Sequence, residues 1–157
     1  MSERVPLASM VLRASPVSRA VEETNRRMLR ARDAMDRDYG HPLDVPSLAR
    51  IAHVSEAHFI RTFRATFGET PHRYLQRRRV ERAMFLLRET GGEVSEICLD
   101  VGFTSLGTFG RTFRAIVGES PTTYRRRAAD LRAVPACFAR AWTRPSSFGE
   151  AGGAGVG

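Results

Sequence analysis

Two segments of the chain carry apolar and polar side chains with the period of an amphipathic α-helix. In residues 56–67, and again in residues 106–117, apolar or small side chains recur three and four positions apart. The expected inward positions are Phe59, Thr62, Phe63, Thr66 and Phe67 in the first segment, and Phe109, Thr112, Phe113, Ile116 and Val117 in the second. Because positions three and four apart share one face of a helix, both segments are predicted to be helices with one buried face. Gly68 and Gly118 follow where a C-terminal glycine ends a helix.

These segments belong to an internal repeat with an offset of 50 residues. Residues 61–71 read RTFRATFGETP, and residues 111–121 read RTFRAIVGESP. At the same offset Tyr74 matches Tyr124. Self-similarity of this kind predicts two copies of one supersecondary unit.

Each copy begins with a shorter apolar pattern. The pattern comprises Leu48, Ala49, Ile51 and Ala52 in the first copy, and Ile97, Cys98, Val101 and Gly102 in the second. Breaks follow at residues 53–55 and 103–105, where Ser55 and Ser105 are placed to cap the next helix. A short helix, a tight break and a second helix with a polar outer face form a helix-turn-helix unit. The pattern therefore predicts two such units.

The remaining periodic segments complete an all-α fold of about seven helices. One helix is predicted over residues 23–39, a long linker helix over 71–89 and a final helix over 121–131. The predicted domain spans residues 23–131, with helix-turn-helix units at about 44–67 and 94–117, an N-terminal tail at 1–22 and a partly flexible C-terminal tail at 132–157. At a rise of about 1.5 Å per residue, the linker helix can hold two recognition helices about one DNA turn apart.

The charge of the chain indicates the chemistry of its partner. The net charge is +8, the isoelectric point is about 11.0, and all 25 basic residues are arginine. An excess of positive charge favours a polyanionic partner. Arginine in addition forms bidentate contacts with phosphate groups and with guanine edges.

Other classes of protein are not indicated by the sequence. It contains no HExxH, Walker or GxSxG motif, so neither an enzymatic activity nor a cofactor is predicted. Cys98 and Cys137 form no CxxC pair, and no metal site is expected. No apolar run is long enough to span a membrane, and no signal peptide is recognisable. The expected location is the cytoplasm, in association with the nucleoid.

The repeat resembles the signature of AraC/XylS-type regulators. The resemblance is carried by GESPTTYR at residues 118–125, by VGF at 101–103, by Phe109 with RTFR at 111–114, and by a linker-helix pattern from Tyr74 to Leu87. It extends over roughly residues 25–130. It implies two helix-turn-helix subdomains joined by a helix, double-stranded DNA as the partner, and transcriptional regulation. The usual form of that regulation in the family is activation through contact with RNA polymerase.

Two departures from the usual family pattern bear on function. About two dozen residues precede the predicted domain, which leads us to expect a stand-alone member with no small-molecule effector domain on this chain. Gly107 and Gly110 face outward on the second recognition helix and have no side chain to read a base. The second unit is therefore expected to contribute less sequence specificity than the first.

Contacts with DNA bases are predicted on the outward faces of the two recognition helices. The positions are Glu56, Ala57, Ile60 and Arg61 in the first helix, and Leu106, Gly107, Gly110 and Arg111 in the second. Arg61 and Arg111 are the strongest candidates, because a bidentate arginine–guanine pair gives about 1–3 kcal/mol of discrimination. A phosphate contact is the alternative for each. Ile60 and Leu106 either contact a thymine methyl group or pack at the turn, and Glu56 either accepts from cytosine or only favours the helix N-terminus.

Contacts with DNA phosphates are predicted at nine further positions. They are Ser55, Arg64, Arg73, Arg77, Arg78, Ser105, Arg114, Arg125 and Arg126. For each arginine the alternative is a solvated surface charge. Arg79 is instead predicted to pair with an acidic residue inside the fold.

Two other functions remain open on the sequence alone. A nucleoid-type or RNA-binding protein would use the positive charge with little base reading, as Gly107 and Gly110 would allow. An interaction module would use the fold to hold a polymerase or an effector-sensing protein, with the apolar segment 138–142 as the docking site.

Overall fold

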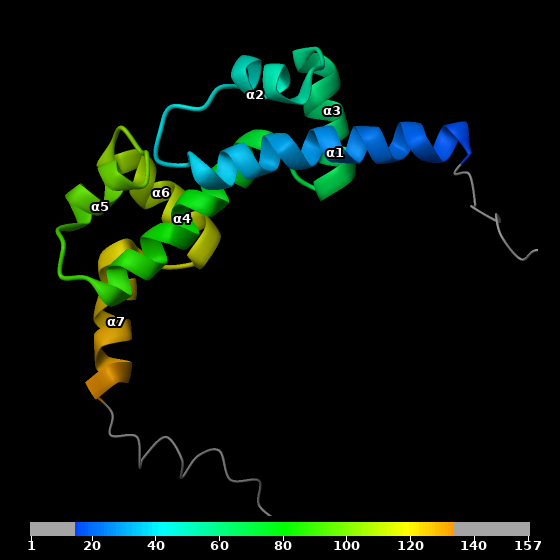
Figure 1. The fold of residues 1–157 in the computed structure, drawn as a ribbon. Helices are drawn as coiled ribbons and strands as arrows, with labels where there is room; N and C mark the ends of the chain where they lie inside the picture. The colour runs from blue at the N-terminus through cyan, green and yellow to red at the C-terminus, as the bar shows by residue number, and fades with distance from the viewer. Residues whose placement is uncertain (1–14, 134–157) are drawn as a thin grey trace, which may run out of the picture.

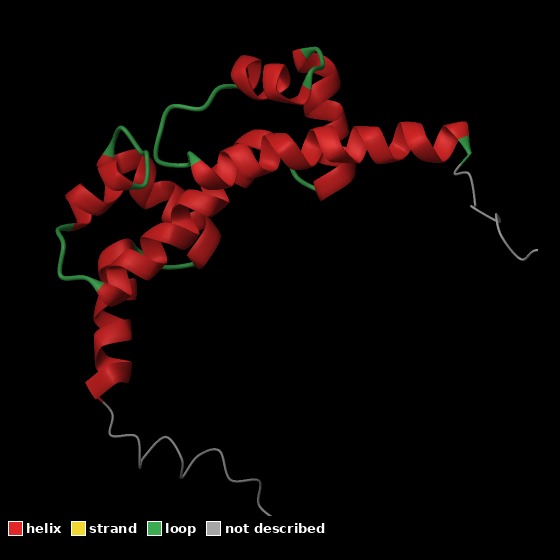
Figure 2. Ribbon diagram, in the orientation of Figure 1, coloured by secondary structure: helices red, strands yellow, loops and turns green. Residues whose placement is uncertain are grey.

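The computed structural model describes residues 15–133, and every regular element in this range is an α-helix, as Figure 2 shows. The helices are α1 (Pro16–Arg37), α2 (Val45–Ala52), α3 (Glu56–Phe67), α4 (Pro71–Glu89), α5 (Val94–Asp100), α6 (Leu106–Val117) and α7 (Pro121–Ala133) (Figure 1). The all-α prediction is confirmed, and the last helix ends two residues later than expected. Most of the two predicted tails, including Cys137 and segment 138–142, lies outside the described residues.

The first helix begins at Pro16, seven residues before its predicted start. Ser15 caps it by accepting a hydrogen bond from the Ser18 amide at 3.2 Å, and the proline occupies the first turn. Val17 and Val21 are 75% and 54% exposed, so this end of α1 extends beyond the core. Because this end of α1 packs no continuous apolar face against the core, its sequence shows only a weak helical period. Residues 16–22 nevertheless belong to the helix, and the prediction of a tail there was wrong.

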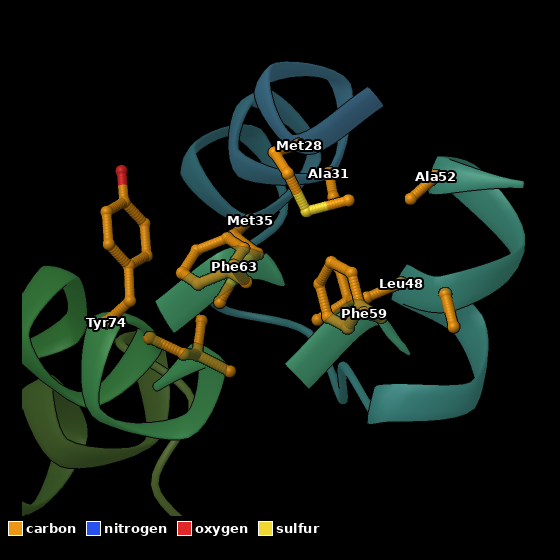
Figure 3. Packing of buried hydrophobic residues seen from close by; sticks show 10 residues of the cluster. Met28, Ala31, Met35, Leu48, Ala52, Phe59, Phe63 and Tyr74 are labelled. Atoms are coloured by element: carbon orange, nitrogen blue, oxygen red, sulfur yellow. The ribbon is translucent and has the colours of Figure 1, made fainter. Parts of the chain in front are cut away.

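The first helix-turn-helix unit encloses a hydrophobic core of its own. Met28 and Met35 of α1 pack with Phe59 and Phe63 of α3, and all four side chains are fully buried. Figure 3 shows Phe63 beside Met35 and facing Tyr74 of α4. The ring centroids of Phe63 and Tyr74 are 5.6 Å apart in an edge-on arrangement, a favoured geometry for aromatic pairs.

The second unit repeats this packing. Phe109 and Phe113 of α6 are fully buried against Ile97 and Cys98 of α5. The Phe113 ring lies edge-on to Tyr124 of α7, with centroids 5.7 Å apart. The repeat in the sequence is therefore a repeat of aromatic packing.

Helix α4 contributes to both cores and joins the two units (Figure 1). Its first half supplies Tyr74 and Leu75 to the first core. Its second half supplies Val80, Ala83 and Leu87 to the second. The predicted linker helix is confirmed with the bounds expected for it.

The ends of the recognition helices α3 and α6 form as their sequences indicate. Ser55 and Ser105 each accept a hydrogen bond from the amide three residues later, at 3.4 and 3.1 Å. Gly68 and Gly118 follow the helices with φ of 77° and 92°, a left-handed conformation that glycine adopts without steric cost. The local sequence therefore sets where both helices begin and end.

Three positions that were predicted to face inward are exposed instead. Thr66 and Ile116 lie in the last turns of α3 and α6, and Ile51 lies near the end of α2. Ile116 is 40% exposed and Ile51 is 36% exposed. Phe67 and Val117, the last residues of α3 and α6, still pack against the two cores, so the last turn of each helix is covered on one side only.

The turns of the two units differ by one residue. The left-handed residue after the first helix is His53 in one unit, with φ of 55°, and Gly102 in the other, with φ of 91°. The capping serine follows two positions after His53 but three positions after Gly102. The offset between the units is therefore 49 residues before the turn and 50 after it. Ala52 thus corresponds to Val101, both fully buried, and Gly102 lies in the turn rather than on the predicted apolar face.

Candidate nucleic-acid interface

The face of α3 opposite the core is exposed to solvent. Phe59 and Phe63 anchor the opposite face, which leaves Glu56, Ala57, Ile60, Arg61 and Arg64 exposed. Ile60 is 39% exposed, so it is not completely packed at the turn. Neither Arg61 nor Arg64 forms an ion pair with any residue between 15 and 133. Both guanidinium groups are therefore open to an external acceptor.

The outward face of α6 has the same orientation on its unit but carries fewer side chains. Leu106, Gly107, Arg111 and Arg114 are exposed, and Gly110 is half-buried. Arg111 donates one hydrogen bond to the Thr108 hydroxyl at 3.3 Å, which leaves most of its donors free. The predicted outward positions of both helices are thus accessible on the surface.

A further pair of exposed residues lies in the first turns of α3 and α6, beside the predicted base contacts. His58 of α3 and Thr108 of α6 lie at equivalent places in the repeat and are both exposed. Thr108 contacts Arg111, as described above, and also accepts a hydrogen bond from the Ser105 hydroxyl at 3.1 Å. The 50-residue offset could have identified this pair.

Arg77, a predicted phosphate contact, is held within the fold. Its guanidinium donates to Glu69 at 2.6 Å and pairs with Glu81. These hydrogen bonds, led by the one to Glu69, raise the pKa of Arg77. The guanidinium also lies over the Tyr74 ring, 5.0 Å from its centroid. The second unit repeats the arrangement with Arg127, which pairs with Glu119 and lies over the ring of Tyr124.

Two more predicted phosphate contacts are engaged in the same way. Arg78 bridges Asp36 of α1 and Glu81 of α4, at 2.7 Å in each case. Arg125 donates to the Gly92 carbonyl at 2.6 Å and so ties α7 to the loop after α4.

The remaining predicted phosphate contacts are exposed. Arg73, Arg114 and Arg126 form no ion pair within residues 15–133. Ser55 and Ser105 are exposed as well and use their oxygens as helix caps.

Arg79 is held inside the fold as predicted, but the prediction that its partner is an acidic residue was wrong, because both of its acceptors are backbone carbonyls. Arg79 Nε donates to the Tyr39 carbonyl at 2.7 Å, and a terminal nitrogen donates to the His41 carbonyl at 3.1 Å. No carboxylate of the described chain lies within ion-pair distance. Burial lowers the pKa of Arg79, but a guanidinium stays charged in a protein. Charge and periodicity could not identify these acceptors, because backbone carbonyls leave no trace in a sequence.

Tyr74 links α4 to α1 through its hydroxyl. The hydroxyl donates to an Asp36 carboxylate oxygen at 2.8 Å. Burial and this hydrogen bond raise the pKa of Tyr74 to about 12. The hydroxyl of Tyr124, its counterpart in the repeat, has no hydrogen-bond partner among residues 15–133. The tyrosine–aspartate hydrogen bond between α4 and α1 therefore has no counterpart at Tyr124; the equivalent pair of helices, α7 and α4, is linked instead by Arg132 and Glu89, at 2.6 Å.

The described part of the chain offers neither a membrane span nor a metal site. None of its helices combines the length and the apolar character needed to cross a membrane. Residues 15–133 also contain no cluster of histidine, cysteine and carboxylate side chains that could hold a metal ion.

Comparison with known proteins identifies relatives of this fold. A family model described as a helix-turn-helix domain matches residues 48–127, just over half of the chain. An uncharacterised HTH-type transcriptional regulator of Haemophilus influenzae is 39% identical over 61 residues, which is 39% of this chain and 20% of the relative. The HTH-type transcriptional regulator MtrA of Neisseria gonorrhoeae is 31% identical over 67 residues, or 43% of this chain and 22% of the relative. The chain thus spans about a fifth of the length of these two relatives.

Solved structures share the architecture of two units around one helix. The DNA-binding domain of AdpA, a global transcriptional factor solved in complex with a target DNA, matches with a TM-score of 0.64 and 30% identity, covering 68% of this chain and 96% of that one. An AraC-type regulator from Chromobacterium violaceum matches with a TM-score of 0.63 and 27% identity, covering 69% and 96%. The duplicated helix-turn-helix fold and these matches together show that the chain belongs to the helix-turn-helix domain family of AraC-type transcriptional regulators, which are not enzymes.

Proposed function

We propose that this chain is a sequence-specific DNA-binding regulator of transcription that inserts α3 and α6 into adjacent segments of the major groove. The observation that carries the proposal is the pair Arg61 and Arg111, equivalent in the repeat and exposed on the outward faces of two similarly packed units. The structure of the AdpA domain on its target DNA, at 30% identity, supports DNA as the partner.

The arginines predicted to contact DNA divide into three groups on this proposal. Arg61 and Arg111 read bases, because each lies on an outward face with donors available for a guanine edge. Arg64, Arg73, Arg114 and Arg126 neutralise phosphates, because they are exposed and form no ion pair in residues 15–133. The three arginines that already pair with acceptors of the fold, Arg77, Arg78 and Arg125, are left out of this surface.

The two units are expected to read DNA unequally. The outward face of α3 offers Glu56, Ala57 and Ile60 beside its arginine, whereas α6 offers Leu106 and two residues without side chains, Gly107 and Gly110. A Cβ built on Gly110 would meet no atom within 4 Å, and one on Gly107 would make only ordinary contacts. Packing within the fold therefore does not require either glycine. The first unit should fix most base positions, while the second should contribute mainly backbone contacts.

In vitro selection of DNA bound by the full chain at one fixed salt concentration tests the proposal. We expect a site with two specified segments about 10 base pairs apart, one more strongly defined than the other. The double variant Arg61→Ala/Arg111→Ala should lose this preference and keep its helical content. Failure of the wild-type chain to enrich any sequence would contradict sequence-specific binding and would leave the nucleoid-type alternative.

Transcriptional activation through contact with RNA polymerase is the regulatory role that the family resemblance implies. Transcription in vitro from a promoter carrying the selected site upstream should rise when the protein is added. A fall in transcript from the same template would instead make the protein a repressor. The double variant serves as the control, because it should leave transcription unchanged.

A further inference from the structure

The two helix-turn-helix units touch each other directly as well as through α4. The turn after α1 belongs to the first unit, where Tyr39 packs against the first core. The turn after α5 belongs to the second, where Phe103 is part of the second core. Arg79 in the middle of α4 contacts both turns: it donates to the Tyr39 carbonyl as described, and its guanidinium lies 5.9 Å from the centroid of the Phe103 ring.

The backbones of the two turns approach so closely that Gly102 leaves no room for a side chain and Gly40 leaves very little. A Cβ on Gly102 would lie 2.8 Å from the Tyr39 carbonyl oxygen and 3.0 Å from Cζ of Arg79. A Cβ on Gly40, in the opposite turn, would lie 3.0 Å from the Asp100 carbonyl oxygen. Both turns therefore present glycine at the contact: a side chain at Gly102 would displace the opposite backbone, and one at Gly40 would press tightly against it.

Helix α4 does not by itself require this contact. Leu75 is its last fully packed residue in the first core, and Val80 is its first in the second. One helical turn lies between them, and Arg79 is the residue of that turn whose hydrogen bonds reach the loop after α1. The planar guanidinium fork can hold two carbonyls in a fixed geometry, and hydrogen bonds from a charged donor are stronger than neutral ones.

We infer that Arg79 is a positioning residue: by holding the Tyr39 and His41 carbonyls against the glycine turn of the second unit, it fixes the orientation of one recognition helix relative to the other. The spacing of DNA segments that the protein accepts then depends on a residue that lies off both recognition helices. The effect on DNA spacing rests on the proposed function, whereas the fixed orientation of α3 relative to α6 does not.

The geometry is measured on the DNA-free protein by pulsed electron spin resonance. Spin labels are placed at Ala65→Cys and Ala115→Cys, exposed and equivalent positions of α3 and α6. Cys137 is replaced by serine, while Cys98 is buried and so protected from the label. We expect one narrow distance distribution in the parent protein, a broader one in Arg79→Ala and an intermediate one in Arg79→Lys.

Two further variants keep this test decisive. Arg82→Ala removes an exposed arginine from the next turn of α4, whose guanidinium stacks on Phe85 of the same helix, and should leave the distribution unchanged. Gly40→Ala keeps Arg79 but wedges a methyl group against the opposite turn, and should broaden or shift it. Circular dichroism verifies that each variant is folded. An unchanged distribution in folded Arg79→Ala would overturn the inference.

The consequence for DNA is measured with the selected site and with versions carrying one extra base pair between its two segments. The parent protein should lose about tenfold or more in affinity on the insertion, since misplacing one unit forfeits at least the contacts of a mismatched base pair. Arg79→Ala should bind the original site more weakly but lose less than about threefold on the insertion. Equal losses in both proteins would overturn the inference. If no DNA is selected at all, the proposed function fails, and the spin-label distances still decide the role of Arg79.

Discussion

Some arginine side chains of this protein pair with carboxylates of the fold, whereas others remain free on the surface. The presence or absence of an acidic neighbour decides between the two environments. Arg77 and Arg127 lie eight positions after a glutamate in each repeat and pair with it. Arg61 and Arg111 have no such acidic neighbour and remain on the surface. Charge alone therefore overstates the number of groups available to DNA, because a carboxylate inside the fold competes with phosphate for the same donors.

Replacing Arg61 should change which sequences are bound, whereas replacing Arg73 should change how tightly all are bound. Arg61→Ala removes a proposed base contact, and we expect discrimination at one base position to fall by about 1–3 kcal/mol. Arg73→Ala removes a proposed phosphate contact and should weaken all sequences about equally. Competition binding against single-base variants of the selected site measures both effects. A uniform loss for Arg61→Ala would place that side chain on a phosphate.

Removing the Tyr74 hydroxyl should destabilise the protein, whereas the same change at Tyr124 should not. Tyr74→Phe loses the 2.8 Å hydrogen bond to Asp36, and we expect the free energy of unfolding to fall by about 1–2 kcal/mol. Tyr124→Phe is the matched control, since its hydroxyl bonds to nothing in residues 15–133. Urea denaturation of the two variants measures the difference, and equal stabilities would show that this hydrogen bond contributes nothing.

The same hydroxyl gives the stability a pH dependence at alkaline pH. The pKa of Tyr74 is about 12 in the folded protein, against about 10 in an unfolded chain. Folding thus favours the neutral hydroxyl. The contribution of this hydroxyl to the free energy of unfolding is complete below pH 10 and is lost as the pH rises toward 12. Tyr74→Phe should lack this part of the decline when unfolding is followed from pH 9 to pH 12.

At the scale of the elements, the two units differ most in the turn between their helices. His53 adopts the left-handed conformation that Gly102 supplies in the other unit. A residue with a Cβ is strained there by about 1 kcal/mol or more. The second turn, in contrast, needs its glycine for two reasons, a positive φ and the contact with Tyr39.

Exchanging the residues at these turns should have opposite effects on stability. His53→Gly should raise the free energy of unfolding by about 0.5–1 kcal/mol, because relief of the left-handed strain exceeds the entropy lost by glycine. Gly102→Ala should lower it by at least about 1–3 kcal/mol, because strain and overlap add. Thermal unfolding of the two variants compares them directly. Destabilisation by His53→Gly would show that the imidazole makes a contact worth more than the strain.

The glycines of α6 allow a prediction about the second recognition helix. Gly107→Ala and Gly110→Ala should each stabilise the protein by about 1 kcal/mol, because an added methyl group meets open space or ordinary contacts. Chemical denaturation measures the gain. Ala57 of α3 corresponds to Gly107 in the repeat and shows that the fold accepts alanine at this position. Lower stability in either variant would mean that α6 needs its glycines for folding.

At the scale of the whole molecule, two small cores are held as one body by α4 and by the contact at Arg79. Each core places one helix on the surface with an arginine outward. A phosphate surface of four arginines should make DNA affinity fall with salt with a logarithmic slope of about −4. Arg64→Ala/Arg114→Ala should reduce that slope by about 2. Arg26→Ala, an exposed arginine of α1 beside Glu23, is the control and should leave the slope unchanged in a salt titration of binding.

The sequence by itself determined the elements of this protein. Period, capping serines and terminal glycines predicted six helices closely, and the repeat predicted two units of the same packing, because these signals depend on residues within a few positions of one another. The start of α1 escaped prediction because Val17 and Val21 are mostly exposed and form no buried face that would give this end of the helix a clear apolar period.

Only the tertiary structure decided which charged groups are free and how the units meet. The carboxylate that holds Arg78 lies 42 positions earlier in the chain, and the carbonyl that holds Arg79 lies 40 positions earlier. Periodicity carries no information at such separations, and a carbonyl acceptor is common to every residue. The one-residue difference between the turns was likewise hidden, because the repeat is clear only on the side of the turn where the aromatic residues lie.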